Sequence, residues 1–217
     1  GLGVEMNVDT LDNRGGSLVA DAALSITGSG VLGNDQGIIS AGSVLSVTDR
    51  DLAQKRQALN NGTGTLIAGQ SLQVDSASYS GSGKALSLRD LAFKLSHDFV
   101  NTGLFQANGN LSVETAGLLT NQGSFQAGDG LRLNASALDN TASGSISARR
   151  VRVNALNQLD NRGLIDGEAT RLSAANLNNL GTGRIYGDHL SIAATNVTNS
   201  VEGSTAATIA ARNRLDI

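Results

Sequence analysis

A short frame of residues recurs along almost the whole chain with a period of about 20 residues. Each copy opens with an apolar residue, carries Asn two positions later and then Gly, and closes with alternating apolar residues. The copies open at Leu11, Leu32, Leu59, Tyr79, Phe99, Leu119, Leu138, Leu159, Leu177 and Val197. A fixed period of this length predicts a solenoid, because each unit is too small to bury its apolar face except against copies of itself.

The copy at residues 119–133 indicates what one repeat folds into. Phe125 and Ala127, and then Leu131 and Leu133, alternate with polar or small residues. This alternation is typical of short strands with one buried face, and the Gly and Asn residues between them favour turns. We therefore expect a parallel β-helix of about ten coils with about 20 residues per coil. By analogy with other parallel crossovers it should be right-handed.

The whole of residues 1–217 should form one repeat segment, and the frame breaks twice within it. The coil that opens at Leu32 is about seven residues too long, and the excess falls in residues 48–58, which predicts an inserted loop. Such a loop is a candidate for binding, although a solvated insertion is the interpretation we favour. Around residues 76–98 the spacing fades and the frame places Gly81 where other copies have Asn, which predicts an irregular coil.

Composition agrees with a stacked β-fold. The chain contains no Pro, which could not donate to a β-ladder, and no Cys, so disulfides and thiolate metal sites are excluded. No apolar run reaches the ~20 residues that span a bilayer, so we do not expect the chain to be embedded in a membrane. The repeat pattern is cut at both ends, and we expect a piece of a longer protein.

Asn occupies the same place in nine of the ten copies. These residues are Asn13, Asn34, Asn61, Asn101, Asn121, Asn140, Asn161, Asn179 and Asn199. Stacked amide side chains can form a hydrogen-bonded ladder along a solenoid. A row of ligand-binding residues is the alternative, and we favour a structural Asn ladder at the turn.

The frame resembles the haemagglutinin repeats of filamentous haemagglutinin and of contact-dependent growth inhibition proteins. The resemblance is carried by segments such as residues 11–16, 99–111 and 159–165, which read LDNRGG, FVNTGLFQANGNL and LDNRGLI. It implies the β-helical shaft of a filamentous adhesin or related exoprotein, secreted or held at the surface of a Gram-negative bacterium. It also implies an outer-membrane two-partner secretion transporter as a partner, and a shaft that presents binding or toxin regions away from the cell.

Positive charge gathers in the later coils, although the net charge of the chain is −3. From Arg132 to Arg184 there are seven Arg residues and four acidic residues. Within this stretch Arg132, Arg149, Arg150 and Arg152 are the candidates for binding an anionic host glycan or a surface receptor. A solvated edge whose Arg side chains pair with Asp129, Asp166 or Glu168 is the interpretation we favour, and the small excess of charge predicts no nucleic-acid partner.

Parallel β-helices also include enzymes that degrade polysaccharides, so we examined the carboxylates. Asp139 and Asp160 hold one slot in adjacent copies with Arg162 nearby, but that slot behaves as an exposed turn position. His97 and His189 have no clustered partners. We therefore expect no catalytic residue, no metal site, no cofactor and no enzymatic activity.

Overall fold

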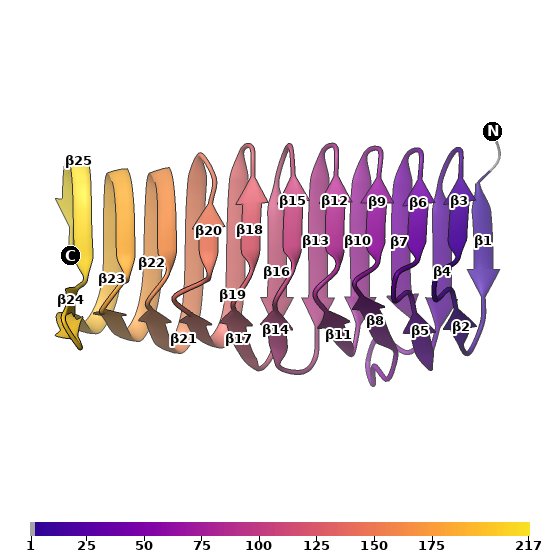
Figure 1. Ribbon diagram of the computed structural model, residues 1–217, viewed down its shortest axis with the longest axis horizontal. Coiled ribbons are helices and arrows are strands. Elements are labelled where there is room, and N and C mark those ends of the chain that lie inside the picture. Colours follow the sequence, from indigo (N-terminus) through magenta and orange to yellow (C-terminus); the bar gives the residue numbers. More distant parts are fainter. Residues whose placement is uncertain (1–2) are drawn as a thin grey trace.

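The computed structural model describes residues 3–217 and is a rod of stacked β-coils (Figure 1). The first and last strands of the chain lie at opposite ends of the rod. Successive coils pair in parallel at an offset of about 20 residues, and their strands form three faces. The predicted parallel β-helix of about ten coils is confirmed. Within residues 3–217 there is no helix long and apolar enough to cross a membrane.

The strands of each coil follow one another in a fixed order around the rod. The first face contains β1 (Val4–Asn7), β4 (Leu24–Gly28), β7 (Val44–Asp49), β10 (Ser71–Ser76), β13 (Asp90–Leu95) and β16 (Leu111–Thr115). The second face contains β2 (Leu11–Asp12), β5 (Val31–Gly33), β8 (Ala58–Gly62), β11 (Ser78–Gly81), β14 (Phe99–Asn101) and β17 (Leu118–Asn121). The third face contains β3 (Ser17–Ala20), β6 (Ile38–Ala41), β9 (Thr65–Ala68), β12 (Lys84–Ser87), β15 (Leu104–Ala107), β18 (Ser124–Ala127) and β20 (Ser145–Ser147).

In the later coils single long strands bend around the corners and serve more than one face. These are β19 (Gly130–Asn140), β21 (Arg150–Asn161), β22 (Leu164–Leu180), β23 (Arg184–Glu202) and β25 (Thr208–Asp216). The short β24 (Thr205–Ala206) pairs antiparallel with the end of β23. Because the strands are longer, fewer residues at the corners of these coils lie outside the hydrogen-bonded sheet.

Apolar residues of equivalent position form continuous columns inside the rod. On the first face Leu91, Leu111 and Leu131 lie in register, and all three are buried. On the third face Phe105, Phe125 and Ile146 do the same. Burying one such side chain contributes roughly 1.5–3 kcal/mol, so the columns are the main stabilising feature of the coil. Alternation within each strand sends the intervening residues outward.

The second face is interrupted between β11 and β14. Strands β2, β5, β8 and β11 form a separate four-stranded sheet, whereas the first and third faces pair without a gap through β10–β13 and β12–β15. A register shift in β11 aligns Gly81 with Gly62 and leaves no residue of β11 opposite Asn61. The sequence frame had placed Gly81 in the Asn slot, and the register shows that this alignment is wrong. Gly81 has φ +113°, which a side chain would strain.

Aromatic residues fill the core where the second face is interrupted. Tyr79 packs edge-on against Phe93 and Phe99, with ring centroids 5.3 and 5.6 Å apart. Phe105 contacts the rings of Tyr79, Phe93, Phe99 and Phe125. Such pairs add stabilisation beyond their buried area. The interruption is therefore bridged by packing.

Candidate functional site

The Asn residues that recur once per coil are bonded to one another. In seven of these residues the side-chain Nδ2 donates to Oδ1 of the Asn in the next coil, at 2.7 Å from Asn13 to Asn34 and 2.8 Å from Asn121 to Asn140. The same bond joins Asn34 to Asn61, Asn101 to Asn121, Asn140 to Asn161, Asn161 to Asn179 and Asn179 to Asn199. Because the seven Asn residues from Asn34 to Asn179 are also buried, their amides are occupied inside the protein and not offered to a ligand.

The Asn row has one break, at the irregular coil. Nδ2 of Asn61 donates to the hydroxyl of Tyr79 at 3.0 Å, and the row resumes at Asn101. Burial raises the pKa of Tyr79 to about 12, opposed by the hydrogen bond from Asn61, so the phenol is neutral at physiological pH. Tyr79 thus closes the first run of the row.

Three arginines lie in register on the outer side of the first face. Arg132 in β19 faces Arg152 in β21, and Arg152 faces Arg171 in β22. All three side chains are exposed, and among residues 3–217 none makes an ion pair or a side-chain hydrogen bond. We call these three residues the arginine row. Sequence reasoning missed Arg171, because its inward neighbour Thr170 replaces the aliphatic residue that marks the strand in other copies.

The structure separates Arg149 from the rest of the predicted basic set. Its guanidinium lies 3.4 Å from Asp129 and 3.7 Å from Glu168, as the pairing interpretation required. Arg150 begins β21, faces Gly130 in register, and is exposed. The predicted set therefore divides into a paired residue at the corner, a strand-end residue, and two members of the arginine row.

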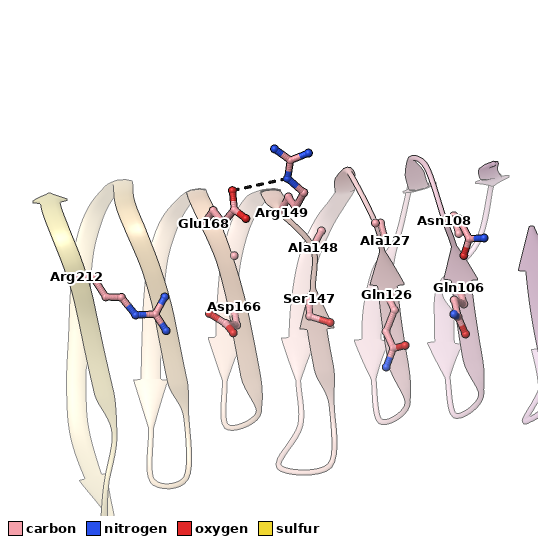
Figure 2. Close-up of a pocket in the computed structure, with 13 residues that line it drawn as sticks. Gln106, Asn108, Gln126, Ala127, Ser147, Ala148, Arg149, Asp166, Glu168 and Arg212 are labelled. Atoms are coloured by element: carbon pink, nitrogen blue, oxygen red, sulfur yellow. Dashed lines mark ion pairs between the residues drawn. The ribbon is translucent and has the colours of Figure 1, made fainter. Parts of the chain in front are cut away.

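Arg149 instead lines a polar hollow where the third face meets the corner, shown in Figure 2. The hollow has a volume of about 710 Å³. Outward side chains of successive coils line it, among them Gln106, Gln126, Ser147 and Asp166. Small residues such as Ala127 and Gly167 at the corner make the surface concave. Its charges are mixed, since Arg149 and Arg212 face Asp166 and Glu168, so it has no preference for one sign of ligand.

The inserted loop, residues 50–57, is tied to the rod by polar contacts. Arg50 donates to Asp9 at 2.7 Å and to Asn7 at 2.6 Å, two coils back. Lys55 pairs with Asp75 and donates to the backbone carbonyl of Lys94 at 3.3 Å, in the two following coils. The Lys55 side chain is only 10% exposed. The loop therefore lies along the surface as a strap, a role that the charge pattern of the sequence did not reveal.

Asp49, the last residue of β7, holds this strap to the rod. The residue is buried, and its carboxylate accepts hydrogen bonds from the backbone N–H groups of Asp51, Arg56 and Gln57. Burial alone would raise the pKa of Asp49, but these N–H groups and the charge of Lys55 outweigh it and hold the pKa below its ordinary value. Asp49 is thus ionised at neutral pH, and its carboxylate holds the loop in place.

Asp139 and Asp160 face each other in register, and Asp160 is engaged in structural contacts. Asp160 accepts hydrogen bonds from Asn178 at 2.8 Å and from Gln158 at 2.6 Å. Burial raises the pKa of Asp139; the charge of Arg162 opposes this rise and that of Asp160 adds to it. Arg162 itself makes a two-point ion pair with Glu202, at 2.8 and 3.0 Å. In residues 3–217 no three His, Cys, Asp or Glu side chains gather as a metal site would require.

Comparison with known proteins agrees with this arrangement of repeats. The family model described as the haemagglutinin repeat matches residues 3–51, 44–92 and 86–163. The protein described as tRNA nuclease CdiA from Yersinia mollaretii is 23% identical over 197 residues, covering 76% of this chain and 7% of that protein. No solved structure matches the chain. Three overlapping matches that together cover well over half of the sequence show that the chain belongs to the haemagglutinin repeat family.

Proposed function

We propose that this chain is part of the shaft of a secreted exoprotein of a Gram-negative bacterium. In this role the rod holds binding or toxin regions of the parent protein away from the cell surface. The parent would leave the cell through an outer-membrane two-partner secretion transporter. The family match and the likeness to a CdiA protein support the proposal, although this chain spans only 7% of that relative.

The observation that carries the proposal is the way in which the coils add length. Each coil pairs with the coil before it and the coil after it, so every further repeat extends the rod by one strand spacing of ~4.8 Å. The buried Asn side chains are bonded within the Asn row and the buried Asp49 holds the loop. In the carboxylate pair considered from sequence, Asp160 is hydrogen-bonded to Gln158 and Asn178. Reach is thus the property that repetition provides.

Deletions in the parent exoprotein test this role. Removal of residues 104–123 joins Gly103 to Ser124, which holds the register of Leu104, and so removes one coil without disturbing its neighbours. Removal of residues 104–113 takes out half a coil, so that Glu114 takes the place of Leu104 and the strands and turns that follow meet the wrong face of the preceding coil. We expect the first variant to be displayed with its reach shortened by ~4.8 Å, and the second to be displayed poorly.

Reach is measured as the height of the distal region above the outer membrane by fluorescence interference, in variants that lack one, three or five whole coils. The activity of the distal region against target cells is recorded alongside. A distal region whose height and activity do not change when whole coils are removed would contradict the proposal.

A further inference from the structure

The arginine row lies in a groove that follows the long axis of the rod. The groove has a volume of about 630 Å³. It is lined by Arg132, Asn134, Arg152, Val153, Asn154, Arg171 and Ser173. Toward the N-terminus it meets a second hollow of about 430 Å³, and Arg132 and Asn134 line both. Because the lining residues come from successive coils, a ligand in the groove would cross the strands and lie parallel to the rod.

The charges of the arginine row are not neutralised within the protein. Arg149, Arg162 and Arg212 each have a carboxylate partner, whereas in residues 3–217 no carboxylate lies within ion-pair distance of the row. Like charges opposite each other in a sheet destabilise it. Stacking three guanidinium groups at the coil spacing of ~4.8 Å is thus unfavourable until anions with a matching repeat lie beside them.

Hydrogen-bonding side chains run beside the row. Asn134, Asn154 and Ser173 lie in register two residues after Arg132, Arg152 and Arg171. Amide and hydroxyl groups at this spacing suit the hydroxyl groups of sugars. No aromatic side chain lines this part of the groove, and all four Phe rings are buried. A ligand that is recognised by stacking its bases is therefore disfavoured.

We propose that the arginine row binds a linear polyuronate, an acidic polysaccharide with one carboxylate on each sugar. A sugar in an extended 1,4-linked chain is about as long as the rise per coil. The spacing of its carboxylates therefore matches the spacing of the arginines. If every sugar turns its carboxylate to the protein, each carboxylate meets one arginine of the row; if every second sugar does, each meets every second arginine. The planar guanidinium matches a carboxylate in a two-point contact. This binding is additional to the role of the rod as a shaft and does not depend on it.

The groove also has a boundary. Glu114 lies in register with Asn134, and Asp75 and Lys94 precede it along the same line of the first face. A polyanion is repelled by Glu114, so its contact with the groove begins at the coil of Arg132 and extends toward Arg171. The site thus holds about three sugars.

The test uses the 217-residue chain and galacturonate oligomers of three to six sugars, with binding measured by titration calorimetry at low salt. The triple variant R132S/R152S/R171S should bind about tenfold or more weakly. The control triple R56S/R89S/R184S removes the same charge at exposed positions outside the groove and should change affinity less than about twofold. Circular dichroism and melting temperature establish that both variants fold. An equal loss in the control triple, or no binding by the unaltered chain, overturns the site.

A gain of binding tests the geometry independently. S112R adds a fourth arginine in register with Arg132, whereas S46R adds one on the same face away from the row. We expect S112R to bind six-sugar oligomers about threefold more tightly with little change for three-sugar oligomers, and S46R to change neither. Gains of equal size in both variants overturn the alignment with the axis. Tighter binding of a sulfated glycan or of single-stranded DNA through the same arginines overturns the ligand class.

Discussion

The coils before and after the gap between β11 and β14 are stabilised in different ways. The earlier coils have a run of three bonded Asn residues, Asn13, Asn34 and Asn61, and a strap formed by residues 50–57 that reaches from the first coil to the fifth. The later coils have no strap, and their Asn row runs unbroken from Asn101 to Asn199 along longer strands. Solenoid coils thus need continuity between neighbours, and different contacts can provide it.

The outer surfaces of the two parts differ more than their cores. On the third face the outward residues of the early coils include Val19, which is 60% exposed, and Leu86. At the equivalent positions the later coils carry Gln106, Gln126 and Asp166. Apart from the Asn row, the inward columns stay largely aliphatic or aromatic in both parts. The repeat therefore fixes what lies inside, whereas the outside varies from coil to coil, as the arginine row illustrates.

The largest expected effect comes from the aromatic residues at the boundary between the two parts. Phe105→Ala removes the ring that contacts Tyr79, Phe93, Phe99 and Phe125, and should reduce the free energy of unfolding by about 3–5 kcal/mol. Phe105→Leu should cost about 1–2 kcal/mol, because Leu66 fills the equivalent slot two coils earlier. Urea denaturation followed by circular dichroism measures both. Equal losses in the two variants would mean that the apolar volume of Leu cannot replace the ring, and that the ring-to-ring contacts themselves carry the stabilisation.

The Asn row of the later coils should show the next largest effect. Asn140→Ala removes bonds to Asn121 and Asn161 and to the backbone carbonyl of Leu164, and leaves buried polar atoms without partners. We expect a loss of about 2–4 kcal/mol in the free energy of unfolding. Asn199→Ala, at the exposed end of the row, should cost less than about 1 kcal/mol. A loss at Asn199 as large as that at Asn140 would argue that the side chains act singly and not as a row.

The strap of the early coils should be sensitive to acid. Because the pKa of Asp49 is lowered in the folded protein, the stability from its ionised form is present above the unfolded pKa of about 3.9 and is lost as pH falls further, through the folded pKa. Below about pH 4 the amide protons of Arg56 and Gln57 should lose protection relative to their intrinsic exchange rates, ahead of those in the later coils. Asp49→Asn should loosen the loop at neutral pH and cost about 1–3 kcal/mol. Unchanged exchange at both amides in this variant would show that the carboxylate does not hold the strap.

Much of the fold was predictable because the repeat is carried by single residues in fixed slots. Apolar pairs such as Leu131 and Leu133 gave the strands, and their spacing gave the parallel stacking. The local irregularities were not predictable in the same way. The bulge that displaces Gly81 depends on the register of β11 against β8, and the strap depends on Asp49 and Lys55 finding partners many residues away.

The arginine site was predictable only in part, for a related reason. Arg132 and Arg152 lie 20 residues apart and could be aligned from sequence. Arg171 follows after 19 residues, and its strand is hard to recognise because Thr170 stands where other copies have an aliphatic residue. The hydroxyl of Thr170 is satisfied inside the rod by the backbone carbonyl of Tyr186, at 2.9 Å. A polar residue in an apolar slot can therefore be recognised as inward only when its partner is known. Arg149 was grouped with the others because the sequence does not show that a corner separates it from the strand that carries Arg152.

The smallest expected effect concerns the stacked acids of the later coils and has the opposite sign. The pKa of Asp139 is raised, so its ionised form is disfavoured in the folded protein at neutral pH. Asp139→Asn removes the repulsion with Asp160, and Asn178 on the other side of Asp160 already shows that an amide fits this line of residues. We expect a gain of a few tenths of a kcal/mol at pH 7 that shrinks as pH falls and Asp139 becomes protonated. Melting temperatures at pH 7 and pH 4 measure the difference, and a destabilised variant would show that the attraction of Arg162 outweighs the repulsion of Asp160.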